Sequence, residues 1–105
     1  MNTTESVHAA RSAHEHLRSR PGGGSPDPQA SAAYASLKAA LDQLWTAAER
    51  HQDTKEIRRA LTRLRVDAEF FAGVNEAEGF RTPAEVWQQY DYIEHAMASG
   101  GKNVA

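Results

Sequence analysis

The chain has 105 residues, of which 40% are hydrophobic and 25% are charged, and its formal net charge is −2 at pH 7. This length and composition predict one small domain with a limited core, and the charge gives no general attraction to nucleic acid or to an anionic membrane. Because cysteine is absent, disulfides, thiolate metal sites and cysteine nucleophiles are excluded.

The N-terminal residues do not have the composition of a signal peptide. Residues 1–5 contain neither a basic segment nor an apolar run. No stretch of the sequence approaches the roughly 20 consecutive apolar residues that cross a bilayer. We therefore expect a cytoplasmic protein with no membrane partner.

The first helical segment is the weakest of the chain. Its apolar stripe has two large side chains among four members, which are Val7, Ala10, His14 and Leu17. We expect residues 1–20 to form a loosely attached helix, followed at residues 21–27 by a flexible linker rich in glycine and proline. Such a linker imposes no geometry, so this helix can complete its own bundle or cross to a second subunit.

Residues 28–98 carry three stronger helices and are predicted to form the core of a bundle. Each helix begins at a capping signal, which is Asp27-Pro28, Asp53 with Glu56, or Thr82-Pro83-Ala84-Glu85. Gly73 predicts a left-handed end to the third helix. The connector at residues 74–81 is short enough to favour antiparallel neighbours.

After each predicted helix start, apolar residues recur at spacings of three and four residues. The three stripes are Tyr34, Leu37, Leu41, Leu44, Trp45 and Ala48; Ile57, Leu61, Leu64, Ala68 and Phe71; and Val86, Tyr90, Ile93 and Met97. No segment alternates with the period of a strand. The sequence therefore predicts an all-α fold, a small antiparallel helical bundle with a weaker N-terminal helix, and a disordered tail at residues 99–105.

Histidines on the first helix are the candidate metal ligands. Glu5 and His8 have the Glu-x-x-His spacing of di-iron bundles, but that spacing occurs once and such a site needs it on two helices. We expect His8 and His16 to be solvated and His14 to be half-buried at a helix interface. No resident metal or cofactor is predicted, and a carboxylate–histidine metal site shared between two chains is kept as an alternative.

The sequence gives little indication of catalysis. No serine lies in a Gly-x-Ser-x-Gly elbow. Asp91 and Glu94 lie beside Trp87 on the fourth helix, where some desolvation is possible, but most acidic residues of the last forty positions are expected to face water. We therefore expect that the protein is not an enzyme and has no catalytic residue.

Basic residues form a surface on the third helix. Lys55, Arg59 and Arg63 repeat every four residues opposite the apolar stripe. Arg58 and Arg65 lie at the flank of this basic row. Like charges at this spacing slightly destabilise a helix, so an anionic counter-surface would relieve them. We take Arg58, Arg59 and Arg63 as an electrostatic partner surface. Nucleic acid is the alternative partner, although the connector of about ten residues is too long for a helix-turn-helix, which has three or four.

Six of the eight aromatic residues lie within residues 70–92. Phe80, Trp87 and Tyr92 are the candidate contacts of a protein partner, because aromatic residues and arginine dominate such contacts. The sequence thus predicts a non-enzymatic protein–protein interaction module, either an accessory or regulatory subunit or a homodimer. The alternatives are a nucleic-acid-binding regulator that uses the basic face, and a helical bundle that binds a metal or a small ligand.

Overall fold

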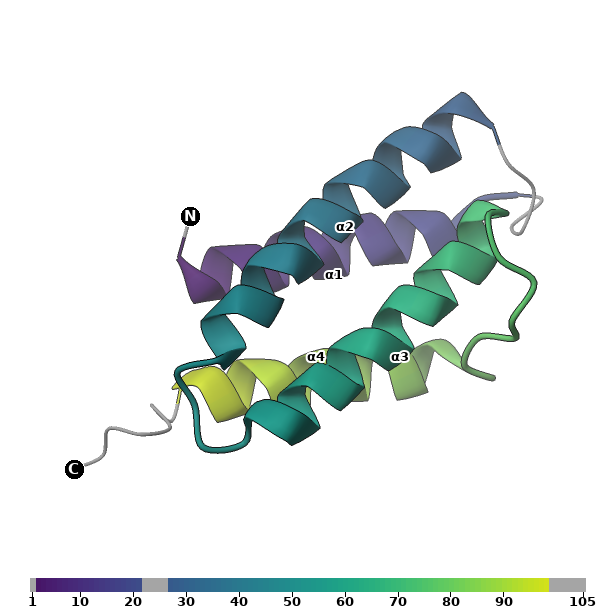
Figure 1. Ribbon diagram of the computed structural model, residues 1–105. Helices are drawn as coiled ribbons and strands as arrows, with labels where there is room; N and C mark the ends of the chain where they lie inside the picture. The colour runs from purple at the N-terminus through teal and green to yellow at the C-terminus, as the bar shows by residue number, and fades with distance from the viewer. Residues whose placement is uncertain (1, 22–26, 99–105) are drawn as a thin grey trace.

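The computed structural model describes residues 2–21 and 27–98, and all regular structure in those two ranges is helical. The elements are α1 (Thr3–Ser19), α2 (Pro28–Ala48), α3 (Thr54–Ala72) and α4 (Pro83–Ala98). Consecutive helices run in opposite directions (Figure 1). The predicted all-α antiparallel bundle is confirmed. Most of the predicted linker, residues 22–26, and the predicted tail, residues 99–105, lie outside the described residues.

Two of the predicted helix starts are formed as expected. The Asp27 carboxylate accepts a hydrogen bond of 2.8 Å from the amide of Ala30, with Pro28 at the first position of α2. At α4, the Thr82 hydroxyl accepts from the amide of Glu85 at 3.3 Å, and the Glu85 carboxylate accepts from the amide of Thr82 at 3.0 Å. Both starts satisfy backbone donors that a helix N-terminus leaves without a partner.

The predicted capping box at α3 is wrong, whereas its predicted end is correct. Asp53 precedes α3, but its side chain makes no capping hydrogen bond. The hydroxyl of Thr54, the first residue of α3, donates instead to the carbonyls of Ala48 and His51, which closes the turn after α2. At the other end of α3, Gly73 has a φ of 79°, the left-handed conformation that favours glycine.

The core lies where the stripes of the four helices meet, and most predicted stripe residues are buried in it. The exceptions stand at the edges of the stripes. Tyr34 and Phe71 are half-buried, and Trp45 is 39% exposed. The ring of Trp45 is covered on one side by the guanidinium of Arg58, 4.8 Å from the ring centre.

The N-terminal helix is an integral part of this bundle. All four members of its stripe, Val7, Ala10, His14 and Leu17, are fully buried, and α1 contacts each of the other three helices. In this structure α1 packs in the bundle of its own chain, and its packing is more complete than its two large apolar side chains predict. The reason is His14, which was predicted to be half-buried but is enclosed by polar partners.

A buried arginine ties together the two ends of the predicted linker. Arg20 donates through Nη2 to the Asp27 carboxylate at 2.5 Å and through Nη1 to the carbonyl of Phe71 at 3.2 Å. The backbone amide of Ala30 and then the bond from Arg20 lower the pKa of Asp27 below its usual 3.8. The end of α1, the start of α2 and the end of α3 are therefore held at one point.

Replacement of Leu17 tests whether α1 is integral to the bundle. We expect Leu17→Ala to lower the free energy of unfolding by about 2–5 kcal/mol, because it leaves a cavity at a fully buried position. His16→Ala, one residue away on the exposed face of α1, should change it by less than about 0.5 kcal/mol. Urea denaturation followed by circular dichroism measures both values. Equal values for the two variants would show that α1 is only loosely attached.

Candidate functional site

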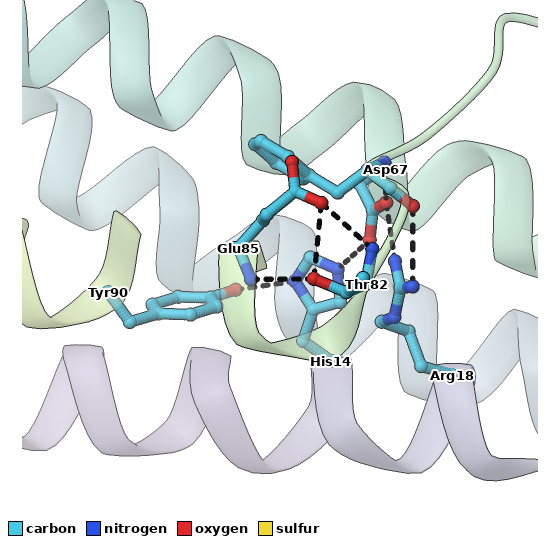
Figure 2. Close-up of polar contacts among 7 residues, drawn as sticks. His14, Arg18, Asp67, Thr82, Glu85 and Tyr90 are labelled. Carbon is cyan, nitrogen blue, oxygen red and sulfur yellow. Dashed lines mark hydrogen bonds and ion pairs between the residues drawn. The ribbon is translucent and has the colours of Figure 1, made fainter. Parts of the chain in front are cut away.

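The main buried polar cluster surrounds the carboxylate of Asp67 in α3, which is fully buried. This carboxylate accepts three hydrogen bonds of 2.6 Å, from Nε2 of His14, from Nη1 of Arg18 and from the backbone amide of Phe80. Figure 2 shows the side chains of His14 and Arg18 reaching Asp67 from α1. Three short bonds to one ionised group, one of them from a cation, offset the cost of removing its charge from water.

Local sequence explains how these groups meet. His14 and Arg18 are four residues apart on α1, so their side chains lie on the same face and reach the same carboxylate. The connector approaches Asp67 from the other side through Gly79. A Cβ atom at Gly79 would collide with the Asp67 carboxylate, so only glycine allows the backbone to pass this close.

The second ring nitrogen of His14 extends the cluster into α4. Nδ1 lies 2.7 Å from the hydroxyl of Tyr90, which is also fully buried. Because a carboxylate only accepts, Nε2 of His14 carries a hydrogen and donates to Asp67, and the Tyr90 hydroxyl also donates to the carbonyl of Ala10 at 3.5 Å. The ring of Trp87 stands edge-on to the His14 ring, with the ring centres 6.2 Å apart.

The pKa values of Asp67 and Tyr90 move in opposite directions. Burial alone would raise the pKa of Asp67, but the hydrogen bonds from His14, Arg18 and the Phe80 amide outweigh it and hold that pKa below 3.8. Burial, followed by the negative charge of Asp67, raises the pKa of Tyr90 well above 10. At neutral pH the carboxylate is ionised and the phenol keeps its proton.

The order carboxylate, imidazole and hydroxyl is also that of a catalytic triad. Here Asp67, His14 and Tyr90 are all fully buried, so a substrate reaches the phenol only if the bundle opens. The raised pKa of Tyr90 also opposes the phenolate form that would act as a nucleophile. The arrangement is suited to holding α1, α3, α4 and the connector together.

Asp67 was not among the residues singled out from the sequence. A signal was nevertheless present, because Asp67 is the third residue after Leu64 and directly precedes Ala68, both on the buried stripe of α3. An acidic residue at such a position requires donors from a neighbouring helix. The pair His14 and Arg18 on α1 supplies them.

The three predicted aromatic contacts do not form one patch. Trp87 is half-buried and faces α1, where the guanidinium of Arg11 lies 5.7 Å from its ring centre. Tyr92 is 38% exposed, and its five-residue separation from Trp87 turns it about 140° around α4. Phe80 is half-buried on the connector and packs against the core. Phe80, Trp87 and Tyr92 therefore lie on different parts of the structure.

The three predicted arginines also have different environments. Arg58 turns toward α2, where it binds the Glu49 carboxylate at 2.9 Å. Arg59 points outward and lies 3.7 Å from Glu56, with both side chains exposed. Arg63, one turn after Arg59, also points outward, but its guanidinium lies over the ring of Phe80, 4.7 Å from the ring centre. Arg58 thus stands apart from the other two.

Arg63 and Phe80 are the two predicted contacts that the structure brings together. They border a groove of about 370 Å³ between α3 and the connector. Its lining consists of Thr62, Arg63, Val66, Glu78, Gly79, Phe80, Arg81 and Glu85. Because Gly79 and Phe80 contact Asp67, the buried polar cluster fixes the floor of this groove.

The candidate metal ligands of α1 have other roles. The Glu5 carboxylate accepts from the backbone amide of Asn2 at 3.1 Å, and the Asn2 side chain accepts from the amide of Glu5 at 2.8 Å, a capping box that was not predicted. His8 lies 3.7 Å from Glu94 of α4. Within residues 2–21 and 27–98, no three histidine, aspartate, glutamate or cysteine side chains gather closely enough to hold a metal ion.

Comparison with known proteins gives no further indication of function. No protein-family model matches the chain, and neither a curated protein nor a solved structure shows significant similarity to it. No helix in the described part of the chain is long and apolar enough to cross a membrane. The functional inference therefore depends on the groove and the buried cluster.

Asp67→Asn tests the contribution of the cluster to stability. We expect the free energy of unfolding to fall by about 3–5 kcal/mol, because the guanidinium of Arg18 then stays largely enclosed without a counter-charge. Chemical denaturation measures the difference. The matched control is Asp91→Asn, which removes an exposed ion pair with Arg11 and should cost about 1 kcal/mol or less. Similar losses in the two variants would contradict the assigned role of Asp67.

The same carboxylate predicts a pH dependence of stability. Because the pKa of Asp67 in the folded protein lies below its ordinary value of 3.8, the unfolded chain takes up this proton first as the pH falls. The stabilisation from Asp67 is fully present above the unfolded pKa of 3.8, and it is lost as the pH falls through the lower pKa of the folded protein. Asp67→Asn should therefore lose stability less steeply than the wild type between about pH 5 and 2. Denaturation experiments across that range give the free energy of unfolding at each pH. Equal slopes of this free energy against pH for the wild type and Asp67→Asn would contradict the prediction.

Proposed function

We propose that this chain is a non-enzymatic protein–protein interaction module, acting as an accessory or regulatory subunit, and that the groove beside Phe80 is its docking site. The observation that carries the proposal is the Arg63 guanidinium stacked over the Phe80 ring at the edge of an open groove. Arginine and aromatic side chains are enriched at the energetic centres of protein interfaces.

The rigidity of the groove floor supports this role. The amide of Phe80 donates to Asp67 at 2.6 Å, and the carbonyl of Phe80 accepts from Nη2 of Arg18 at 3.4 Å. The backbone below the ring is therefore fixed before any partner arrives. A preformed surface loses little conformational entropy on binding, which favours affinity.

The polar groups of the groove favour binding over catalysis. The hydroxyl of Thr62 donates to the carbonyl of Arg58 within α3, at 2.9 Å. The carboxylate of Glu85 accepts from the amide and the hydroxyl of Thr82. These groups are occupied in holding the fold, so neither is poised as a nucleophile or a base.

Two other forms of association are weaker proposals. A homodimer would use the same groove, with a second copy of the chain in place of a different protein. Nucleic acid would bind the outward face of α3 through Lys55, Arg59 and Arg63. Glu78 and Glu85 in the groove lining oppose a phosphate backbone there, and for that reason we favour a protein partner.

Phe80→Ala tests the docking site, and Tyr92→Ala, on α4, is the matched aromatic control. We expect Phe80→Ala to weaken association at least about tenfold, because a central aromatic contact is removed, while Tyr92→Ala leaves it unchanged. The measurements are quantitative affinity capture from the native host and sedimentation of the purified chain. Circular dichroism checks that both variants fold.

Two results would contradict the proposal. One is a wild-type chain that remains monomeric and captures no protein. The other is association that Phe80→Ala and Arg63→Gln both leave intact.

A further inference from the structure

We propose that the groove selects an acidic peptide segment, with a side-chain carboxylate bound by Arg63 and an adjacent apolar side chain packed on Val66 and Phe80. This inference depends on the proposed function and deepens it, because it names the chemistry of the partner. It is carried by four observations: the free donors of Arg63, the charge around it, the apolar wall and the carboxylates of the lining.

The stacked guanidinium of Arg63 is arranged to bind a carboxylate. Its central carbon lies over the Phe80 ring, 4.7 Å from the ring centre, and a planar guanidinium has paired N–H groups that match the two oxygens of a carboxylate. The eight ion pairs among the described residues include neither Arg63 nor Arg81. Two guanidinium groups of the groove thus have no carboxylate partner within the described chain.

Further positive charge lies along α3 next to the groove. Arg59 is one turn before Arg63, and Lys55 is one turn before Arg59. Glu56 is 3.7 Å from Arg59, but both side chains are more than half exposed, so this pair is weak. Lys55 and Arg59 therefore add positive charge on the α3 side of the groove, which favours the approach of an acidic segment from that side.

The wall of the groove is apolar. Val66 and Phe80 are both half-buried and border the same hollow. Its volume of about 370 Å³ lies in the range of pockets that enclose ligand groups. An aliphatic or aromatic side chain next to the bound carboxylate would cover both residues.

The carboxylates of the lining favour a peptide over a polyanion. Glu85 is engaged with Thr82, whereas Glu78 is exposed and makes no hydrogen bond or ion pair with the described residues. The repeated phosphates of a nucleic acid would meet repulsion from Glu78. A peptide with one well-placed carboxylate avoids that repulsion, and its backbone amides donate to acceptors such as Glu78.

The test begins with random dodecapeptides selected on the immobilised full chain. We expect the selected peptides to be enriched in aspartate or glutamate next to an apolar residue. Titration calorimetry then compares a selected peptide with its glutamine or asparagine counterpart. Loss of the carboxylate should weaken binding about tenfold to a hundredfold, which is the effect of removing a hydrogen bond to a charged group.

Variants of the chain identify the residue that binds the carboxylate. Arg63→Gln should weaken binding of the acidic peptide as much as removing the peptide's carboxylate does. When the variant is combined with the uncharged peptide, the affinity should fall little further than with either change alone. Arg59→Gln, one turn away and outside the groove lining, should change affinity less than about threefold. Arg63→Glu should no longer bind the acidic peptide. It should instead bind a peptide in which lysine replaces the acidic residue.

The outcomes separate this inference from the proposed function. Selected peptides without acidic enrichment, or peptides that bind Arg63→Gln as well as the wild type, overturn the carboxylate preference. Phe80-dependent capture of a protein would then still support the interaction module. Failure of every peptide to bind also overturns the preference. Arg63-dependent binding of a duplex oligonucleotide, with no acidic peptide bound, would assign the surface to nucleic acid instead.

Discussion

The fold depends on one ionised carboxylate placed where water cannot reach it. Asp67 is stable there because α1 supplies the side-chain donors of His14 and Arg18 and the connector supplies the amide of Phe80. Each donor must arrive within a fraction of an ångström, since a buried charge that lacks a partner costs several kcal/mol. Apolar stripes allow helices to slide or rotate slightly, whereas these three bonds fix α1 and the connector in a single register on α3.

The buried cluster and the outer groove meet at one residue. The backbone of Phe80 faces inward, where its amide and carbonyl bind Asp67 and Arg18. The ring of Phe80 lies beneath Arg63 on the outside. The shape of the docking surface is consequently set from the interior. A change at the cluster should therefore alter the groove without touching any group that a partner contacts.

The sequence predicts the helices well because their signals are local. Periodic apolar residues placed the stripes of α3 and α4, and the residues at Asp27, Thr82 and Gly73 marked helix ends correctly. Asp53 has the right residue type for a cap but not the bond, because the hydroxyl of Thr54 shapes that turn. Which of the two side chains makes a hydrogen bond at this turn depends on the path of the chain that leaves α2. Residue type alone does not specify that path.

The candidate site was harder to predict because it is assembled from distant segments. His14 was placed at a helix interface, but its complete burial follows from Asp67 and Tyr90, which come from other helices. The aromatic residues were grouped by their closeness in the sequence, yet the turn of α4 separates Trp87 from Tyr92. Arg63 and Phe80 were singled out as separate candidates on different elements. Only the fold shows that they border the same hollow.

The close passage of Gly79 over Asp67 has a consequence for the evolution of this chain. A side chain at position 79 would collide with the Asp67 carboxylate, so a larger residue at position 79 is viable only with a change at position 67. Descendants of a common ancestor that keep Asp67 with its donors His14 and Arg18 should therefore also keep Gly79. That set is a compact signature by which kinship can be recognised after the rest of the surface has diverged.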